Sequence, residues 1–121
     1  MSFKKNKYIV VKNVISKDLA IFLYNYIAIK KQVYDTCRKF KYISPFENMI
    51  GFYEDKTGQV ENTYSHYSDV AMETLLLKCQ PVMEKATKLK LYPAYSYTRF
   101  YKNGDELKRH TDRFSCEIST T

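Results

Sequence analysis

The chain has few cysteines and no long apolar run. Its three cysteines, Cys37, Cys79 and Cys116, lie far apart and form no CxxC pair. This odd number and wide spacing argue against a disulfide framework and against a zinc knuckle, so we expect reduced thiols. No run approaches the roughly 18 apolar residues of a membrane span, and the apolar stretch at 8–11 is shorter than the about 7–15 residues of a signal peptide. We therefore expect a cytoplasmic protein that does not enter a membrane.

Positive charge is concentrated in the first third of the sequence. Residues 1–41 hold ten Lys and Arg against two acidic residues, a balance of +8, and residues 42–121 hold ten against eleven, a balance of −1, which gives +7 in total. Such a region can attract nucleic acid or another polyanion, although runs of charge are more often a solvated helix face. With twelve tyrosines that could stack on bases, a nucleic-acid- or protein-binding module without catalysis is the alternative function. Nucleic acid is the less expected partner, because most tyrosines occupy core-like positions.

The spacing of apolar residues predicts two helices. Ser16 is a good N-cap, and the apolar residues that follow it recur at three- and four-residue steps. Ser68 is the expected N-cap of a second helix that runs to about Thr87. Pro81 is expected to kink or divide this second helix.

Other segments have the composition of strands. They are rich in β-branched or aromatic residues, or alternate them with small or polar ones: 8–12, 52–60, 94–101, 107–112 and 116–121. The segment 52–60 fits a β-hairpin that turns at 56–58, and Asn103-Gly104 predicts the turn after 94–101. With 45% hydrophobic residues, the chain is expected to fold as one domain.

His110 and Asp112 form the most informative pattern. On an extended strand residues i and i+2 project from the same face, so this imidazole and this carboxylate can bind one metal ion together. They are two parts of the 2-His-1-carboxylate facial triad, which holds Fe(II) and leaves open positions for a co-substrate and oxygen. The HxD triplet alone is weak evidence, because many proteins contain it by chance.

The sequence around this triplet resembles the iron(II)- and 2-oxoglutarate-dependent dioxygenases, especially the prolyl 4-hydroxylase-like branch. In that family a strand ends in a tyrosine, a glycine turn follows, an apolar residue lies three positions before the histidine, and HxD comes next. The residues at these positions are, in order, Tyr101, Gly104, Leu107, His110 and Asp112. The specific part of the resemblance covers about residues 91–121.

The resemblance implies an α+β fold in which N-terminal helices pack on an incomplete double-stranded β-helix, or jelly roll. Residues 1–121 would form a single domain, the N-terminal part of a dioxygenase domain, with a helical support region at 1–90 and the first barrel strands at 91–121. His110 and Asp112 would bind Fe(II), with 2-oxoglutarate as co-substrate, ascorbate as an optional reductant, and a peptide or small molecule as the hydroxylated substrate. Tyr101 matches a tyrosine that lines the co-substrate pocket, and packing inside the barrel is an equally open role for it.

The family also needs groups that this sequence does not supply. A distal histidine and a later Arg or Lys normally follow HxD by many residues, whereas nine residues follow Asp112 here. We therefore expect the 121-residue chain alone to be inactive and a C-terminal segment or a second chain to complete the barrel. His66 precedes the motif, so we expect a capping or surface role for it. Arg99, Arg113 and Glu117 are expected to be solvated or ion-paired, although the last two could brace the site.

Overall fold

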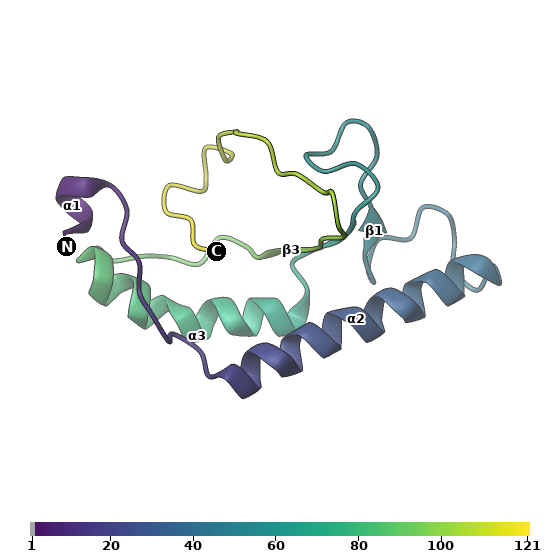
Figure 1. Ribbon diagram of the computed structural model, residues 1–121, viewed down its shortest axis with the longest axis horizontal. Coiled ribbons are helices and arrows are strands. Elements are labelled where there is room, and N and C mark those ends of the chain that lie inside the picture. Colours follow the sequence, from purple (N-terminus) through teal and green to yellow (C-terminus); the bar gives the residue numbers. More distant parts are fainter. Residues whose placement is uncertain (1) are drawn as a thin grey trace.

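Two long helices and a small antiparallel sheet make up the fold. The computed structural model describes residues 2–121, and Figure 1 shows the helices along one side and the sheet beside them. The elements in chain order are α1 (Phe3–Asn6), α2 (Lys17–Lys39), β1 (Phe52–Tyr53), β2 (Tyr64–Tyr67), α3 (Val70–Thr87) and β3 (Tyr97–Phe100). The α+β class is therefore confirmed. None of the helices in residues 2–121 combines the length and apolar character that crossing a membrane requires.

Helix α2 begins where its sequence predicts. The Ser16 hydroxyl accepts a hydrogen bond from the Leu19 amide at 3.1 Å, and Asp18 lies in the first turn, where its charge complements the helix dipole. Only Ile27 and Tyr34 of α2 are buried. The helix thus contributes a narrow stripe to the core and leaves most of its surface to solvent.

Helix α3 begins one residue later than predicted. Asp69 is its N-cap, since the carboxylate accepts a hydrogen bond from the Met72 amide at 3.1 Å, while Ser68 has a positive φ of 55°. The helix ends at Thr87, as expected, and Lys88 follows in the left-handed conformation that closes many helices. Of the two outcomes predicted for Pro81, a kink or a division of the helix, the division is wrong, because α3 runs continuously through this residue.

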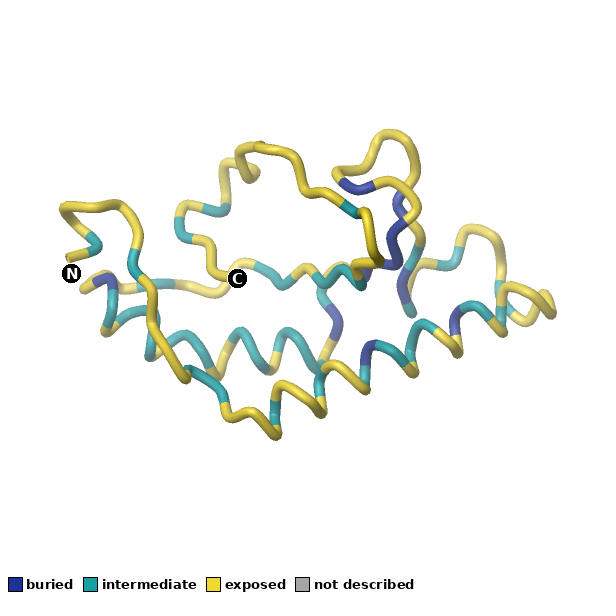
Figure 2. The backbone as a smooth tube through the Cα atoms, viewed as in Figure 1, coloured by how far each residue is buried: buried dark blue, intermediate teal, exposed yellow. Residues whose placement is uncertain are grey.

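The core is small and centres on Tyr64. The sheet order is β1-β2-β3, and Tyr64 pairs with Tyr53 on one side and with Phe100 on the other. Its side chain is 1% exposed, and its hydroxyl donates to the Ile50 carbonyl. Figure 2 shows that buried residues gather at the sheet and the adjoining helix turns, while most of the remaining chain is exposed.

Gly51 lets the chain pass close to this tyrosine. A Cβ at Gly51 would lie 2.5 Å from the Tyr64 hydroxyl oxygen, and its φ of +112° is one that L side chains rarely adopt. A larger residue at position 51 would therefore strain the backbone and displace the Tyr64 ring.

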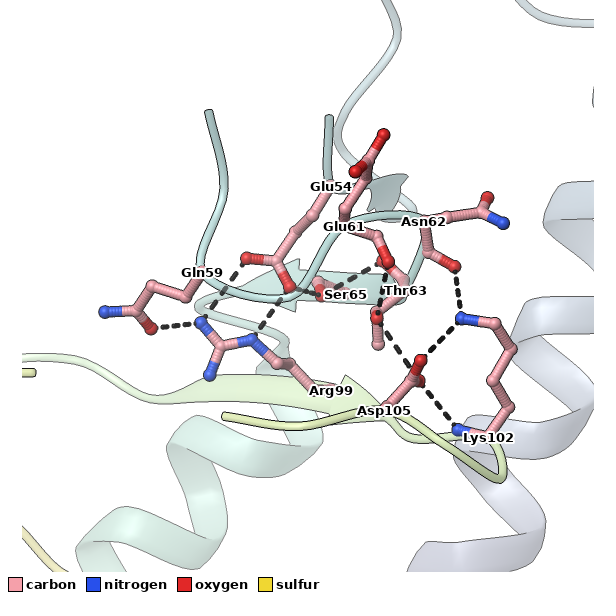
Figure 3. A network of polar contacts seen from close by, with 9 residues as sticks. All are labelled: Glu54, Gln59, Glu61, Asn62, Thr63, Ser65, Arg99, Lys102 and Asp105. Atoms are coloured by element: carbon pink, nitrogen blue, oxygen red, sulfur yellow. Dashed lines mark hydrogen bonds and ion pairs between the residues drawn. The ribbon is translucent and has the colours of Figure 1, made fainter. Parts of the chain in front are cut away.

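The hairpin predicted within 52–60 does not form, because its first strand pairs with a later segment. Residues 55–58 do turn, since the Gly58 amide donates to the Asp55 carbonyl at 3.0 Å, but β1 pairs with β2 at 64–67. A polar network holds the intervening loop against β3 (Figure 3). In it, Arg99 Nε donates to Glu54 Oε2 at 2.8 Å, and the Ser65 hydroxyl donates to the same oxygen at 3.0 Å. Arg99 is therefore ion-paired, as expected.

Three predicted strands are wrong. Residues 8–12, 107–112 and 116–121 are extended or turning segments without strand pairing, and residues 2–121 do not form a jelly roll. The composition of a segment does not by itself make it a strand, because a strand also needs a neighbouring strand for its backbone hydrogen bonds. Segment 8–11 instead leaves its apolar side chains largely exposed. After β3 the chain reverses, since the Lys102 amide donates to Asp105 Oδ2 at 2.9 Å, and Figure 1 shows the following segment arching away from the sheet.

Candidate metal site at His110 and Asp112

His110 and Asp112 lie side by side in the segment that follows β3. His110 Nε2 is 3.4 Å from Asp112 Oδ1, and the two side chains are 32% and 42% exposed. The segment is not a strand, but the 3.4 Å separation shows that both side chains lie on one side of it. A solvent ion can therefore reach both donor atoms.

The remaining polar atoms of the pair already have partners. His110 Nδ1 lies 2.9 Å from the Lys108 carbonyl oxygen, so its N–H donates to that oxygen and leaves the lone pair on Nε2. The Ser119 hydroxyl donates to Asp112 Oδ2 at 2.6 Å, which leaves Oδ1 on the side of the histidine. Outer partners of this kind orient the ligands of metal sites.

The separation of the two donor atoms fits a shared metal ion. Two neighbouring ligands at about 2.1 Å and a right angle are separated by about 3.0 Å, close to the 3.4 Å between Nε2 and Oδ1. Within residues 2–121, no third His, Cys, Asp or Glu side chain joins the pair in a metal-binding group. The described chain therefore offers two ligands, and an ion held by them keeps open positions.

Tyr101 lies immediately after β3 and is 46% exposed. It does not pack in the core, and no hydrogen bond joins it to His110 or Asp112 in the described chain. A co-substrate role for Tyr101 stays a prediction.

Arg113 is held by aromatic rings. Its guanidinium carbon lies 4.5 Å from the ring centroid of Tyr95 and 5.6 Å from that of Tyr67. The expectation of a solvated or ion-paired Arg113 therefore missed its aromatic contacts. Glu117 is exposed, as expected of a charged side chain.

His66 occupies a second polar cluster, which the sequence reading missed. It lies on β2 at 7% exposure, with Nδ1 2.5 Å from Lys30 Nζ and 3.4 Å from Asp69 Oδ2. Lys30 also forms an ion pair with Asp69, and the Tyr26 hydroxyl donates to Asp69 at 2.6 Å. The predicted capping or surface role of His66 is wrong. One sequence feature could have indicated this cluster: Lys30 follows Tyr26 by four residues, which places both side chains on the same, partly buried side of α2.

The electrostatics of this second cluster follow from burial and from Lys30. Burial and the Lys30 ammonium lower the pKa of His66. Burial raises the pKa of Asp69, but hydrogen bonds from Lys30, Tyr26 and the Met72 amide lower it overall. Burial and Asp69 raise the pKa of Tyr26 to about 12. The cluster therefore holds a neutral imidazole beside a charged Lys–Asp pair, and it joins α2, β2 and the start of α3.

A shallow hollow of about 650 Å³ lies beside the C-terminal end of α2. Its lining residues include Tyr34, Arg38, Phe46 and Tyr53, and none of them lies in the segment after β3. The hollow is therefore separate from the His110 and Asp112 pair.

Comparisons with protein-family models, with curated proteins and with solved structures gave no match for this chain. A functional interpretation therefore depends on the residues and on their geometry.

Proposed function

We propose that this chain is the N-terminal part of an iron(II)- and 2-oxoglutarate-dependent dioxygenase domain that hydroxylates a peptide or a small molecule. The observation that carries the proposal is the 3.4 Å separation of His110 Nε2 and Asp112 Oδ1. These atoms belong to an HxD triplet that is preceded by Tyr101, Gly104 and Leu107 at the family's spacing.

His110 and Asp112 would hold the iron through Nε2 and Oδ1. When bound, the iron would supply oxygen activation coupled to oxidative decarboxylation of 2-oxoglutarate. The carbonyl of Lys108 would fix the histidine tautomer, and the Ser119 hydroxyl would orient the carboxylate. Tyr101 would donate its hydroxyl hydrogen to an oxygen of the co-substrate.

A complete site needs a second histidine and a basic residue for the distal carboxylate of 2-oxoglutarate. We assign both to polypeptide other than these 121 residues, either a C-terminal segment or a second chain. The same polypeptide would supply the strands that complete the jelly roll. The outer edge of β3, which is the last strand in the sheet order, supports this assignment because it is open to pairing.

Manganese binding tests the proposal on the isolated chain. Mn(II) has the same preference for nitrogen and oxygen ligands, and it is followed by its electron paramagnetic resonance signal. We expect weak binding to the wild-type chain, because two ligands fix a metal less well than three, and at least about tenfold weaker binding to His110→Ala and to Asp112→Ala. Glu106→Ala is the matched control, because it removes an exposed carboxylate from the same segment. Equal affinity of the wild type and His110→Ala would refute the assignment.

A further inference from the structure

The segment that carries His110 and Asp112 has little to hold it in place. Every residue from 106 to 115 is exposed, so burial does not fix this part of the chain. The hydrogen bonds of His110 and Asp112 stay within the segment after β3, to Lys108 and Ser119. The two donor atoms therefore need an anchor to the sheet if they are to stay 3.4 Å apart.

Arg113 contacts two aromatic rings outside the segment. Its guanidinium carbon lies 4.5 Å from the Tyr95 ring centroid and 5.6 Å from the Tyr67 ring centroid, which is the range of cation–π contacts. The two rings stack on each other with centroids 4.8 Å apart. Tyr67 ends β2, and the Ser68 amide donates to the Ser96 carbonyl at 2.9 Å beside it, so the rings are fixed to the end of the β2–β3 ladder.

A turn follows Arg113 directly. The Cys116 amide donates to the Arg113 carbonyl at 2.9 Å, which closes a turn between the two residues. The HxD triplet is therefore followed at once by a compact attachment, made by Arg113 on the rings of Tyr95 and Tyr67.

We propose that Arg113 is a positioning residue that holds His110 and Asp112 in their metal-binding arrangement by stacking on Tyr95 and Tyr67. It does not touch the metal, and it acts by keeping the residue next to Asp112 fixed against the sheet. A flexible site must be ordered when the metal binds, which weakens binding, whereas a held site does not carry that cost. The identity of the bound metal rests on the proposed function. The role of Arg113 in ordering the segment does not.

The test compares Arg113→Ala and Arg113→Lys with Arg109→Ala as the matched control. Arg109 is an exposed arginine of the same segment for which residues 2–121 show no aromatic contact. Three quantities are measured: Mn(II) affinity, NMR order parameters of the backbone amides at 110–112, and the midpoint of thermal unfolding. We expect Arg113→Ala to weaken Mn(II) binding about five- to thirtyfold, as the loss of two cation–π contacts at an exposed site implies.

Order parameters at 110–112 should fall from near 0.85, which is typical of rigid backbone, to below about 0.6 in Arg113→Ala. Arg113→Lys should keep only part of the Mn(II) affinity and of the backbone order that Arg113→Ala loses, because an ammonium lacks the planar face that stacks on a ring. Arg109→Ala should match the wild type. The unfolding midpoint of Arg113→Ala should fall only by the few degrees that a loss of about 1–2 kcal/mol implies, so that the chain stays folded at the temperature of the binding assay.

Two results would overturn the proposal. In the first, Arg113→Ala behaves like Arg109→Ala in both affinity and order. In the second, its unfolding midpoint falls enough to account for both losses, which would make Arg113 a general stabilising residue. If wild-type Mn(II) binding is insensitive to His110→Ala, the dioxygenase assignment fails, and the order parameters alone still decide whether Arg113 holds the segment.

Discussion

Replacing Asp69 by alanine removes two kinds of contact at once. Its carboxylate caps α3 through the Met72 amide, and it is the buried partner of Lys30 and Tyr26. Asp69 is 1% exposed and the Lys30 side chain is 16% exposed, so solvent offers only partial compensation to the ammonium left behind. We expect the substitution to lower the free energy of unfolding substantially.

The magnitude follows from these contacts. Loss of an N-cap costs about 0.5–2 kcal/mol, and removing one partner of a buried ion pair costs about 3–5 kcal/mol. Lys30 retains some exposure, so we take the lower end of the second range, about 3 kcal/mol, and expect a total of about 3.5–5 kcal/mol. Typical stability for 121 residues is about 6–18 kcal/mol, so the loss is a large fraction of the whole. Asp69→Asn should cost about half as much, because the amide oxygen can still cap the helix.

Urea unfolding followed by far-ultraviolet circular dichroism and by tyrosine fluorescence measures this change, since the chain has no tryptophan. Asp55→Ala is the matched control. Asp55 also accepts from a backbone amide, that of Thr57 at 2.8 Å, but it is exposed. Its midpoint should stay close to that of the wild type. A loss of less than about 1 kcal/mol in Asp69→Ala would show that the buried cluster does not hold α2 to α3.

Three further predictions follow from the same structure. Because the pKa of His66 is lowered in the folded chain, the unfolded chain binds more protons just below the ordinary histidine value of about 6.5, so stability should fall as pH falls through this value. His66→Gln should make the urea midpoint depend less on pH over this range, and an unchanged dependence would contradict the argument. Gly51→Ala should cost about 2–4 kcal/mol through its contact with Tyr64 and its positive φ. Gly104→Ala, which has a positive φ but open space around it, should cost clearly less in the same unfolding experiment. The basic segment 1–41 should bind DNA only weakly, and binding that survives high salt in a fluorescence titration would favour the nucleic-acid alternative.

Local signals predicted part of this fold correctly. Ser16 caps α2 through a hydrogen bond to a residue three positions away, and alternation within 94–101 predicts the strand that becomes β3. These features depend on neighbours in sequence. The partner of β1 does not, because β2 is a later segment that the pattern within 52–60 does not specify. Strands at 107–112 and 116–121 failed for the same reason: their pattern is favourable, but pairing depends on a neighbouring strand.

In the candidate site too, contacts between sequence neighbours were predictable and contacts between distant residues were not. Two-residue spacing predicts that the side chains of His110 and Asp112 lie together, and Nε2 and Oδ1 are 3.4 Å apart although the segment is not a strand. Stacking of Arg113 on Tyr67 and Tyr95 joins residues far apart in the sequence, so composition and periodicity give no sign of it. The burial of His66 beside Lys30 likewise depends on tertiary packing.

Turnover by the isolated chain is a separate prediction. We expect no succinate from the 121-residue chain with iron, ascorbate, 2-oxoglutarate and oxygen, because two of the groups that position metal and co-substrate are assigned to other polypeptide. A misplacement of about 1 Å can already cost about a hundredfold in rate. Robust succinate formation that is lost on Asp112→Ala would mean that another residue of this chain completes the site.

The most direct test of the central claim is to identify the histidine that binds the metal. The chain has two histidines, His66 and His110, so ¹⁵N-histidine labelling and pulsed electron paramagnetic resonance of bound Mn(II) can assign an imidazole ligand unambiguously. We predict a ¹⁵N hyperfine coupling that persists in His66→Gln and disappears in His110→Gln. A wild-type spectrum without this coupling, or a coupling that persists in His110→Gln, would contradict the account.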